Sequence, residues 1–129
     1  MEKTTAVIKE LKPGGFVVID GVPCRVEKVQ VSTSGKHGAA KCRVDAIGLF
    51  DERRRSIVKP ADETVEVPIV SKRRAQVIAI MGDKAQIMDL EDYSIFELDI
   101  PEEKKDKLKP GEETFYYEVL GIKTLKEIK

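Results

Sequence analysis

Residues 24–46 read CRVEKVQVSTSGKHGAAKCRVDA, and the rest of the chain is organised around this stretch. On its N-terminal side, apolar and polar residues alternate from Cys24 to Val31, and on its C-terminal side they alternate again from Cys42 to Ala46. Alternation with a period of two is typical of a half-buried β-strand. The sequence therefore predicts two antiparallel strands joined as a hairpin, with both cysteines on the buried face.

The segment between the predicted strands is longer than a chain reversal needs. Hairpin turns normally use about two to five residues, whereas residues 32–39 supply eight. Gly35 and Gly38 flank Lys36 and His37, which leaves the lysine at a tip with little bulk beside it. A solvated turn lysine is the simpler interpretation, but long loops on rigid strands often carry function.

Several kinds of chemistry are excluded by residue type and spacing. A phosphate-binding P-loop would need Ser or Thr after Gly-Lys and Gly five residues earlier, where His37 and Gln30 stand. His37 is the single histidine, and it forms no closely spaced zinc-ligand pair with Cys24 or Cys42. No paired carboxylates or nucleotide fingerprint are recognisable. We expect no metal, no bound cofactor and no enzymatic activity.

The composition predicts a cytoplasmic protein. Its 129 residues, of which 36% are charged and 41% hydrophobic, suffice for one ordinary domain or two small ones. No apolar run approaches the ~20 residues of a membrane span, and residues 1–5 do not begin a signal peptide. Two cysteines do not make a disulfide framework, so we expect reduced thiols and no membrane partner.

The charges are unevenly distributed, although they sum to zero. Between residues 25 and 59, nine Lys or Arg oppose four acids, whereas between residues 83 and 120 five oppose twelve. A basic half attracts polyanions, so a nucleic acid is expected to approach the half with the loop. The alternative is a charge-rich surface of the kind found in heat-adapted proteins. The candidates for RNA contact are Lys41, Arg43, Arg53, Arg54 and Arg55.

The strand pattern predicts an all-β chain of two small barrels, residues 1–69 and 70–129. The first, with a β-bulge at Gly48 and no helical stretch, is expected to have strands at residues 5–11, 16–19, 22–31 and from 42 onward. The second is typical of an OB-fold, with a short helix at residues 101–108. Its strands are expected at residues 75–81, 85–90, 93–100, 113–120 and 122–128.

The aromatic residues determine how the second barrel is interpreted. Phe96, Phe115 and Tyr117 share the apolar phase of their strands and are expected in the core. Tyr93 and Tyr116 are then the only rings left on an acidic surface, too few for base stacking along a basic groove. We therefore expect a spacer and docking module, with independent nucleic-acid binding as the alternative.

The loop string closely resembles the modification loop of the translation initiation factor 5A family, relatives of bacterial elongation factor P. The resemblance extends through Gly14-Gly15, Pro23-Cys24 and residues 47–51, 65–70, 81–83 and 86–89. The loop is two residues shorter than the eukaryotic one and has Ala39 where a second His is expected, features that resemble archaeal members. The resemblance implies an SH3-like barrel that carries the loop, followed by an OB-fold.

The resemblance also implies that deoxyhypusine synthase transfers an aminobutyl group from spermidine to Lys36, within a loop that includes Ser34, Gly35, His37 and Gly38. The product is deoxyhypusine or, after hydroxylation, hypusine. The implied partners are the ribosome, with its rRNA, and the peptidyl-tRNA, and the implied role is to promote peptide-bond formation where prolines stall it. The alternative is a general RNA-binding or RNA-chaperone protein with unmodified Lys36.

Overall fold

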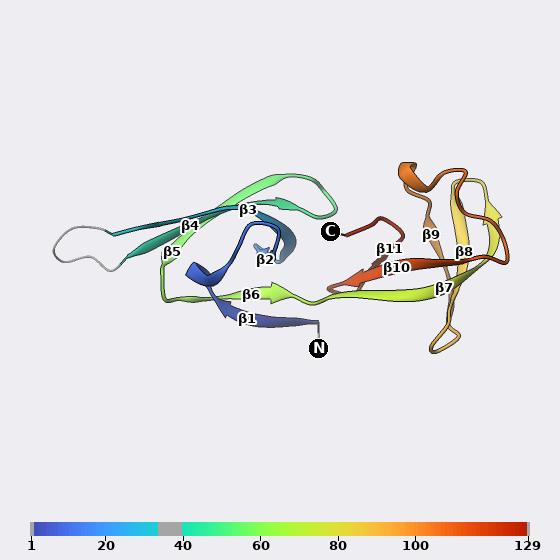
Figure 1. Cartoon of the computed structure of the whole chain (residues 1–129), viewed down its shortest axis with the longest axis horizontal. Helices are drawn as coiled ribbons and strands as arrows, with labels where there is room; N and C mark the ends of the chain where they lie inside the picture. Colours follow the sequence, from blue (N-terminus) through green and yellow to red (C-terminus); the bar gives the residue numbers. More distant parts are fainter. Residues whose placement is uncertain (1, 34–39, 129) are drawn as a thin grey trace. The chain divides into compact units, whose positions relative to one another are not determined.

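The computed structural model describes residues 2–33 and 40–128. Its regular structure is almost entirely β-strand, which confirms the predicted all-β class (Figure 1). The chain divides into two compact units, Met1–Ile69 and Val70–Lys129.

The first unit contains a four-stranded and a two-stranded antiparallel sheet (Figure 1). The larger sheet has the order β2 (Phe16–Ile19), β3 (Val22–Ser32), β4 (Lys41–Gly48) and β5 (Arg54–Pro60). The smaller sheet pairs β1 (Lys3–Val7) with β6 (Thr64–Pro68). Neighbouring strands of the larger sheet are consecutive in the sequence: a tight turn joins β2 to β3, the predicted modification loop stands between β3 and β4, and residues 49–53 stand between β4 and β5. The larger sheet forms a half-barrel, which agrees with the SH3-like barrel that was predicted.

The core of the first unit collects the inward residues of these strands. Cys24 and Cys42 are fully buried in it, which confirms their predicted orientation, and burial raises the pKa of both thiols. The other buried members are Ile8, Val17, Ile19, Val26, Val44, Ala46, Ala61 and Val65.

The second unit is a single five-stranded antiparallel sheet in the order β11-β10-β7-β8-β9. Because β11 contacts β9, the sheet nearly closes into a barrel with the strand order of the predicted OB-fold. Its core contains Ala75, Ala85, Ile87, Tyr116 and Leu125. The strands are β7 (Val70–Met81), β8 (Lys84–Asp89), β9 (Ile95–Asp99), β10 (Glu113–Val119) and β11 (Ile122–Thr124).

The predicted helix at residues 101–108 is wrong in extent. Only the 3-10 turn η2 (Glu102–Lys104) forms, and none of its residues is buried. Six of the eight residues are charged, so no apolar face stabilises a longer helix, and Asp106 adopts a left-handed conformation with φ of 68°. A second 3-10 turn, η1 (Ile8–Glu10), interrupts the first predicted strand and buries Ile8. Among the described residues, no helix has the length and apolar character required to cross a bilayer.

The predicted bulge at Gly48 is also wrong. Gly48 pairs regularly with Cys24, and the register shift instead lies between Val26 and Lys28 of β3. Gly48 is required for another reason, because a Cβ atom there would lie 2.0 Å from Oδ1 of Asp51.

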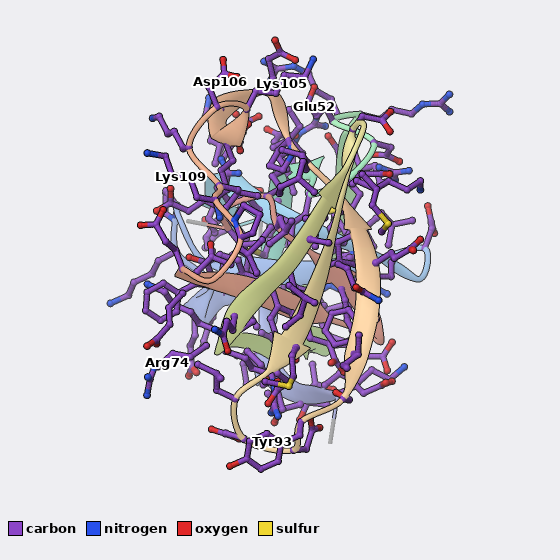
Figure 2. All side chains as sticks on the ribbon, turned by 90° about the vertical axis from the view of Figure 1, so that its right-hand side faces the viewer. Glu52, Arg74, Tyr93, Lys105, Asp106 and Lys109 are labelled. Carbon is purple, nitrogen blue, oxygen red and sulfur yellow. The ribbon has the colours of Figure 1, made fainter. Side chains whose placement is uncertain are left out.

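The predicted phase of β10 is wrong at two residues. Phe115, expected in the core, is 44% exposed, and Tyr116, expected at the surface, is 1% exposed. The Tyr116 hydroxyl donates a hydrogen bond to the buried carboxylate of Asp89, which holds this ring inside the barrel. Tyr117 is buried, as expected, and Tyr93 extends outward from the turn between β8 and β9 (Figure 2).

Candidate functional site

Strands β3 and β4 form a long hairpin that carries the predicted modification loop. They pair from Cys24 and Gly48 at one end to Ser32 and Lys41 at the other. The structure therefore describes the strands on both sides of the loop. The five loop residues named from the sequence lie outside the described residues: Ser34, Gly35, Lys36, His37 and Gly38.

The two strands of the hairpin are supported unequally next to the loop. On the β4 side, Cys42 is fully buried and Ala40 packs against the core. The N–H group of Ala61 donates a hydrogen bond to the carbonyl of Ala40 at 2.9 Å, and Lys41 pairs with Pro60 of β5. On the β3 side, residues 30–33 are all exposed. The core of the first unit therefore fixes the position of the chain where it leaves the loop.

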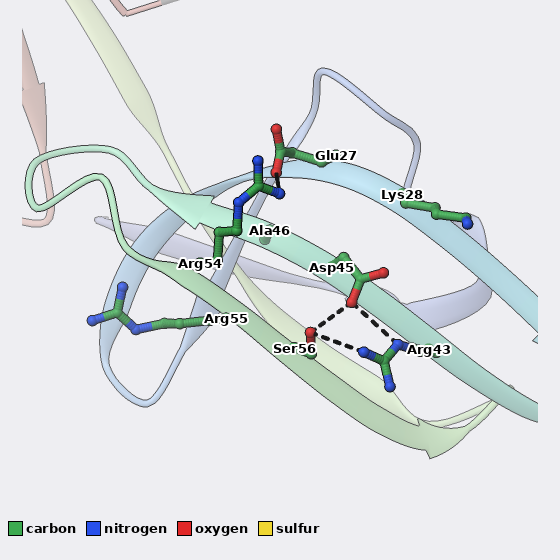
Figure 3. A pocket seen from close by; sticks show the side chains of 8 residues that line it. All are labelled: Glu27, Lys28, Arg43, Asp45, Ala46, Arg54, Arg55 and Ser56. Atoms are coloured by element: carbon green, nitrogen blue, oxygen red, sulfur yellow. Dashed lines mark hydrogen bonds and ion pairs between the residues drawn. The ribbon is translucent and has the colours of Figure 1, made fainter.

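The outer face of the larger sheet carries the cations nearest to the loop. Lys41 and Arg43 alternate along β4 with the buried Cys42 and Val44, so they point outward. Part of this face surrounds a shallow hollow of about 470 Å3 (Figure 3). We call it the outer-face hollow, and it is lined by Glu27, Lys28, Arg43, Asp45, Ala46, Arg54, Arg55 and Ser56.

A small polar network orients Arg43 within the outer-face hollow (Figure 3). Its Nε donates to Oδ1 of Asp45 at 3.1 Å, and its Nη2 donates to Oγ of Ser56 at 3.4 Å. The Ser56 hydroxyl donates to the same Asp45 oxygen at 2.5 Å. This hydroxyl, and after it the Arg43 guanidinium, hold the pKa of Asp45 below its ordinary value. Arg43 is thus prepositioned while half of its side chain stays exposed.

The structure separates the three consecutive arginines predicted as RNA contacts. The Arg54 side chain is 81% exposed and forms an ion pair with Glu27 at 3.1 Å. Arg53 is also exposed. Arg55, only 20% exposed, donates two hydrogen bonds to Asp51, at 3.1 and 2.7 Å, and lowers the pKa of that carboxyl to about 2. Arg53 and Arg54 are therefore available to a ligand, whereas Arg55 is engaged in the fold.

Sequence reasoning missed a second hollow, which lies on the second unit between β7, β10 and η2. It includes Phe115, which the wrong phase of β10 had assigned to the core. The one signal in the sequence was the cationic run at residues 72–74, but such runs are usually solvated surface.

Comparison with known proteins identifies the family. Residues 3–63 match the family model described as "Translation initiation factor 5A-like, N-terminal". The chain is 49% identical over 126 residues to translation initiation factor 5A of Archaeoglobus fulgidus, covering 98% of both chains. It is 55% identical over 119 residues to that of Methanocella arvoryzae, covering 92% of this chain and 93% of the relative.

Solved structures agree with the sequence comparison over the whole length of the chain. The structure titled eukaryotic translation initiation factor 5A from Methanococcus jannaschii matches with a TM-score of 0.86 and 44% identity, covering 99% of this chain and 96% of that one. An eIF-5A family protein from Naegleria fowleri matches with a TM-score of 0.78 and 29% identity, covering 100% and 99%. The chain belongs to the translation initiation factor 5A family.

Proposed function

We propose that this translation factor binds the ribosome beside the peptidyl-tRNA and, through deoxyhypusine or hypusine at Lys36, promotes peptide-bond formation at stalling sequences such as consecutive prolines. The observation that carries the proposal is the full-length similarity to archaeal relatives named translation initiation factor 5A. The long β3–β4 hairpin supports it, because its strands pair up to Ser32 and Lys41 on either side of the Gly-Lys-His-Gly sequence.

The proposed mechanism is positional. Peptide transfer depends on how often the two reacting ends are aligned, and holding one of them in place raises the rate by excluding unproductive geometries. An aminobutyl group on Lys36 lengthens the side chain and adds a second amine. This longer cation reaches toward the acceptor end of the tRNA, while the ribosome supplies the catalysis and the factor needs no bound cofactor.

The outer face of the first unit is the proposed contact with rRNA or tRNA phosphates. Arg43 and Arg54 present exposed guanidinium groups on this face and Lys41 lies on it beside the loop, while the exposed Arg53 immediately precedes β5. Such contacts release counterions and make binding weaken with salt. Deoxyhypusine synthase, with spermidine as the donor, is the proposed partner that modifies Lys36.

The decisive experiment replaces Lys36 by Arg. Arginine keeps a permanent cation of similar length, but its guanidinium cannot accept the aminobutyl group. We expect Lys36→Arg to remain folded and to bind ribosomes, but not to relieve stalling at consecutive prolines in a reconstituted translation assay. Lys41→Arg is the matched control, because it makes the same change at a neighbouring exposed lysine and should keep full activity.

Wild-type activity of Lys36→Arg would overturn the proposal in favour of a general RNA-binding protein with unmodified Lys36.

A second measurement examines the modification directly. Intact mass and peptide mapping of residues 32–41, on protein purified from its own source, should show the aminobutyl increment on Lys36. An additional oxygen on the same peptide would identify hypusine, and its absence deoxyhypusine.

A further inference from the structure

The hollow on the second unit, which we call the β7–β10 cleft, has a volume of about 370 Å3. Its charged and aromatic lining includes Lys72, Arg74, Lys104, Glu113, Phe115 and Glu127. All of these belong to the second unit. The cleft reaches the lower end of the ≈ 300–1,000 Å3 range of small-molecule sites.

Strand register places the aromatic and basic residues of the cleft on one face. Arg74 lies opposite Phe115, and Lys72 lies opposite Tyr117, two residues further along each strand. Residues two apart share a face of a sheet. Tyr116 points to the opposite face, where its hydroxyl bonds to Asp89. The buried hydrogen bond of Tyr116 therefore keeps the neighbouring Phe115 ring turned outward into the cleft.

Two of the three cations in the cleft are not neutralised by an ion pair. The Nζ of Lys72 lies over the Phe115 ring, 4.3 Å from its centroid, and within residues 2–33 and 40–128 neither Lys72 nor Lys104 has a carboxylate within ion-pair distance. Arg74 differs, because it extends to the surface (Figure 2) and contacts Glu113 at 2.6 Å. Burial lowers the pKa of Lys104, an effect that the charges of Glu127 and Glu103 offset only in part, and a bound anion would offset it further.

We propose that the β7–β10 cleft binds one nucleotide of a single-stranded RNA, with the base stacked on Phe115 and the adjacent phosphate held by Lys72 and Lys104. An exposed ring framed by cations is the combination that single-strand binding uses. The base takes the ring face that Lys72 now covers, and the ammonium group moves to the phosphate. An acidic peptide would satisfy the lysines but would leave Phe115 without a contact.

This cleft is not on the face that OB-folds generally use for nucleic acids. That face is formed by the second and third strands of the fold, here β8 and β9. Its outward pairs include Gln86 with Glu97 and Lys84 with Asp99, and the Lys84 charge is neutralised by Asp99 at 2.9 Å. The β7–β10 cleft is the better RNA site, which revises the spacer role expected from the sequence.

The test is a nuclear magnetic resonance titration of the full-length, unmodified chain with hexauridylate and, separately, with uridine monophosphate. Hexauridylate should shift the amide signals of residues 113–117. Phe115→Leu should raise the Kd for these shifts about 5- to 150-fold, the range for loss of one stacked base. Lys72→Gln and Lys104→Gln should each lower the salt slope by about 0.7, the value for one single-strand phosphate contact.

Lys123→Gln is the matched control for Lys72→Gln. Lys123 belongs to the same unit and lies over Phe96 at the same 4.3 Å, but it does not line the cleft. The Lys123→Gln variant should leave the Kd of the cleft for hexauridylate unchanged, and Lys36→Arg should leave this Kd unchanged too. The proposal therefore stands or falls separately from the modification of Lys36.

Four results would overturn the proposal. The cleft signals could fail to shift, or Lys72→Gln and Lys123→Gln could weaken binding equally. Uridine monophosphate binding as tightly as hexauridylate would indicate a free-nucleotide site instead of a strand contact. Equal shifts with hexaglutamate would show that the cleft recognises negative charge alone.

Discussion

The hydrogen bond between Tyr116 and Asp89 predicts that the second unit loses stability in alkali. Asp89 is fully buried and accepts four hydrogen bonds. They come from Nε of Arg73 at 2.7 Å, from the Tyr116 hydroxyl, and from the N–H groups of Glu91 and Asp92 at 2.7 and 3.1 Å. Burial and, next, this bond to the carboxylate raise the pKa of Tyr116 to about 12.

The magnitude follows from the difference between this pKa and the ordinary value of ~10 for tyrosine. Two pKa units correspond to about 2.7 kcal/mol, since each unit is worth about 1.4 kcal/mol. Below pH ~10 the phenol is neutral in both states and the whole contribution is present. Above it the unfolded chain ionises first, so about 1.4 kcal/mol is lost by pH 11 and nearly all of it above pH 12.

Tyr116→Phe isolates this contribution because it removes the titrating group. At neutral pH the variant should be less stable by about 1.5–3 kcal/mol, the range for a hydrogen bond to a charged group. Between pH 9 and pH 11 that deficit should shrink by about 1.4 kcal/mol. The control is Tyr93→Phe, which removes a hydroxyl from a ring that is 68% exposed and should follow the wild type.

Urea unfolding followed by methyl resonances measures each unit separately. Ile87 reports the core of the second unit, and Val44 reports that of the first as an internal reference. If wild type and Tyr116→Phe lose stability in parallel from pH 9 to pH 11, the phenol is not held neutral by the barrel and the reasoning fails. If the stability reported by Val44 also differed between wild type and Tyr116→Phe as the pH rises, the effect would lie in the first unit, which contains neither Tyr116 nor Asp89, and the reasoning would fail as well.

Three further predictions concern the first unit. Gly48→Ala should destabilise it by about 1–3 kcal/mol in urea unfolding, because the new methyl group would lie 2.0 Å from Asp51; wild-type stability would show that Asp51 and Arg55 can separate freely. Arg55 lowers the pKa of Asp51 to about 2, so the ionised Asp51 carboxylate stabilises the unit above pH ~4. This contribution is lost as the pH falls from ~4 to ~2, and Asp51→Asn should therefore weaken the pH dependence of acid unfolding. The double variant Arg53→Gln/Arg54→Gln should lower the salt slope of ribosome binding by about 0.7–0.9 per lost phosphate contact, whereas Arg55→Gln should chiefly lower stability.

The sequence was sufficient to predict the hairpin and the two barrels. Residues 42–46 alternate strictly, and residues 24–26 and 29–31 alternate on either side of the register shift at Val26 and Lys28, so the strand period could be recognised although the bulge could not; the buried cysteines mark the inner face. The candidate Lys36 came from the composition of the loop and its family resemblance. To predict that the strands flanking the loop pair with each other, it was enough that an alternating segment stands on each side of the loop.

The phase of β10 could not be obtained from alternation because three aromatic residues follow one another. Phe115, Tyr116 and Tyr117 fit either phase, and the choice depends on Asp89, a distant residue whose burial no local pattern reveals. For the same reason, Lys72, Arg73 and Arg74 look alike in sequence. In the structure Lys72 covers a ring, Arg73 bonds to the buried carboxylate, and Arg74 pairs with a surface acid.

Strand pairing within each unit has a consequence for synthesis of the chain. Every pairing found among the described residues joins strands of the same unit, and β1 finds its partner in β6, which ends at Pro68. At synthesis rates of about 5–20 residues per second, the second unit takes roughly 3–12 s to produce. β8, the first partner of β7, is complete at Asp89, 20 residues after the first unit ends, so for roughly 1–4 s of that time all strands of the first unit have been made while β7 still lacks a partner.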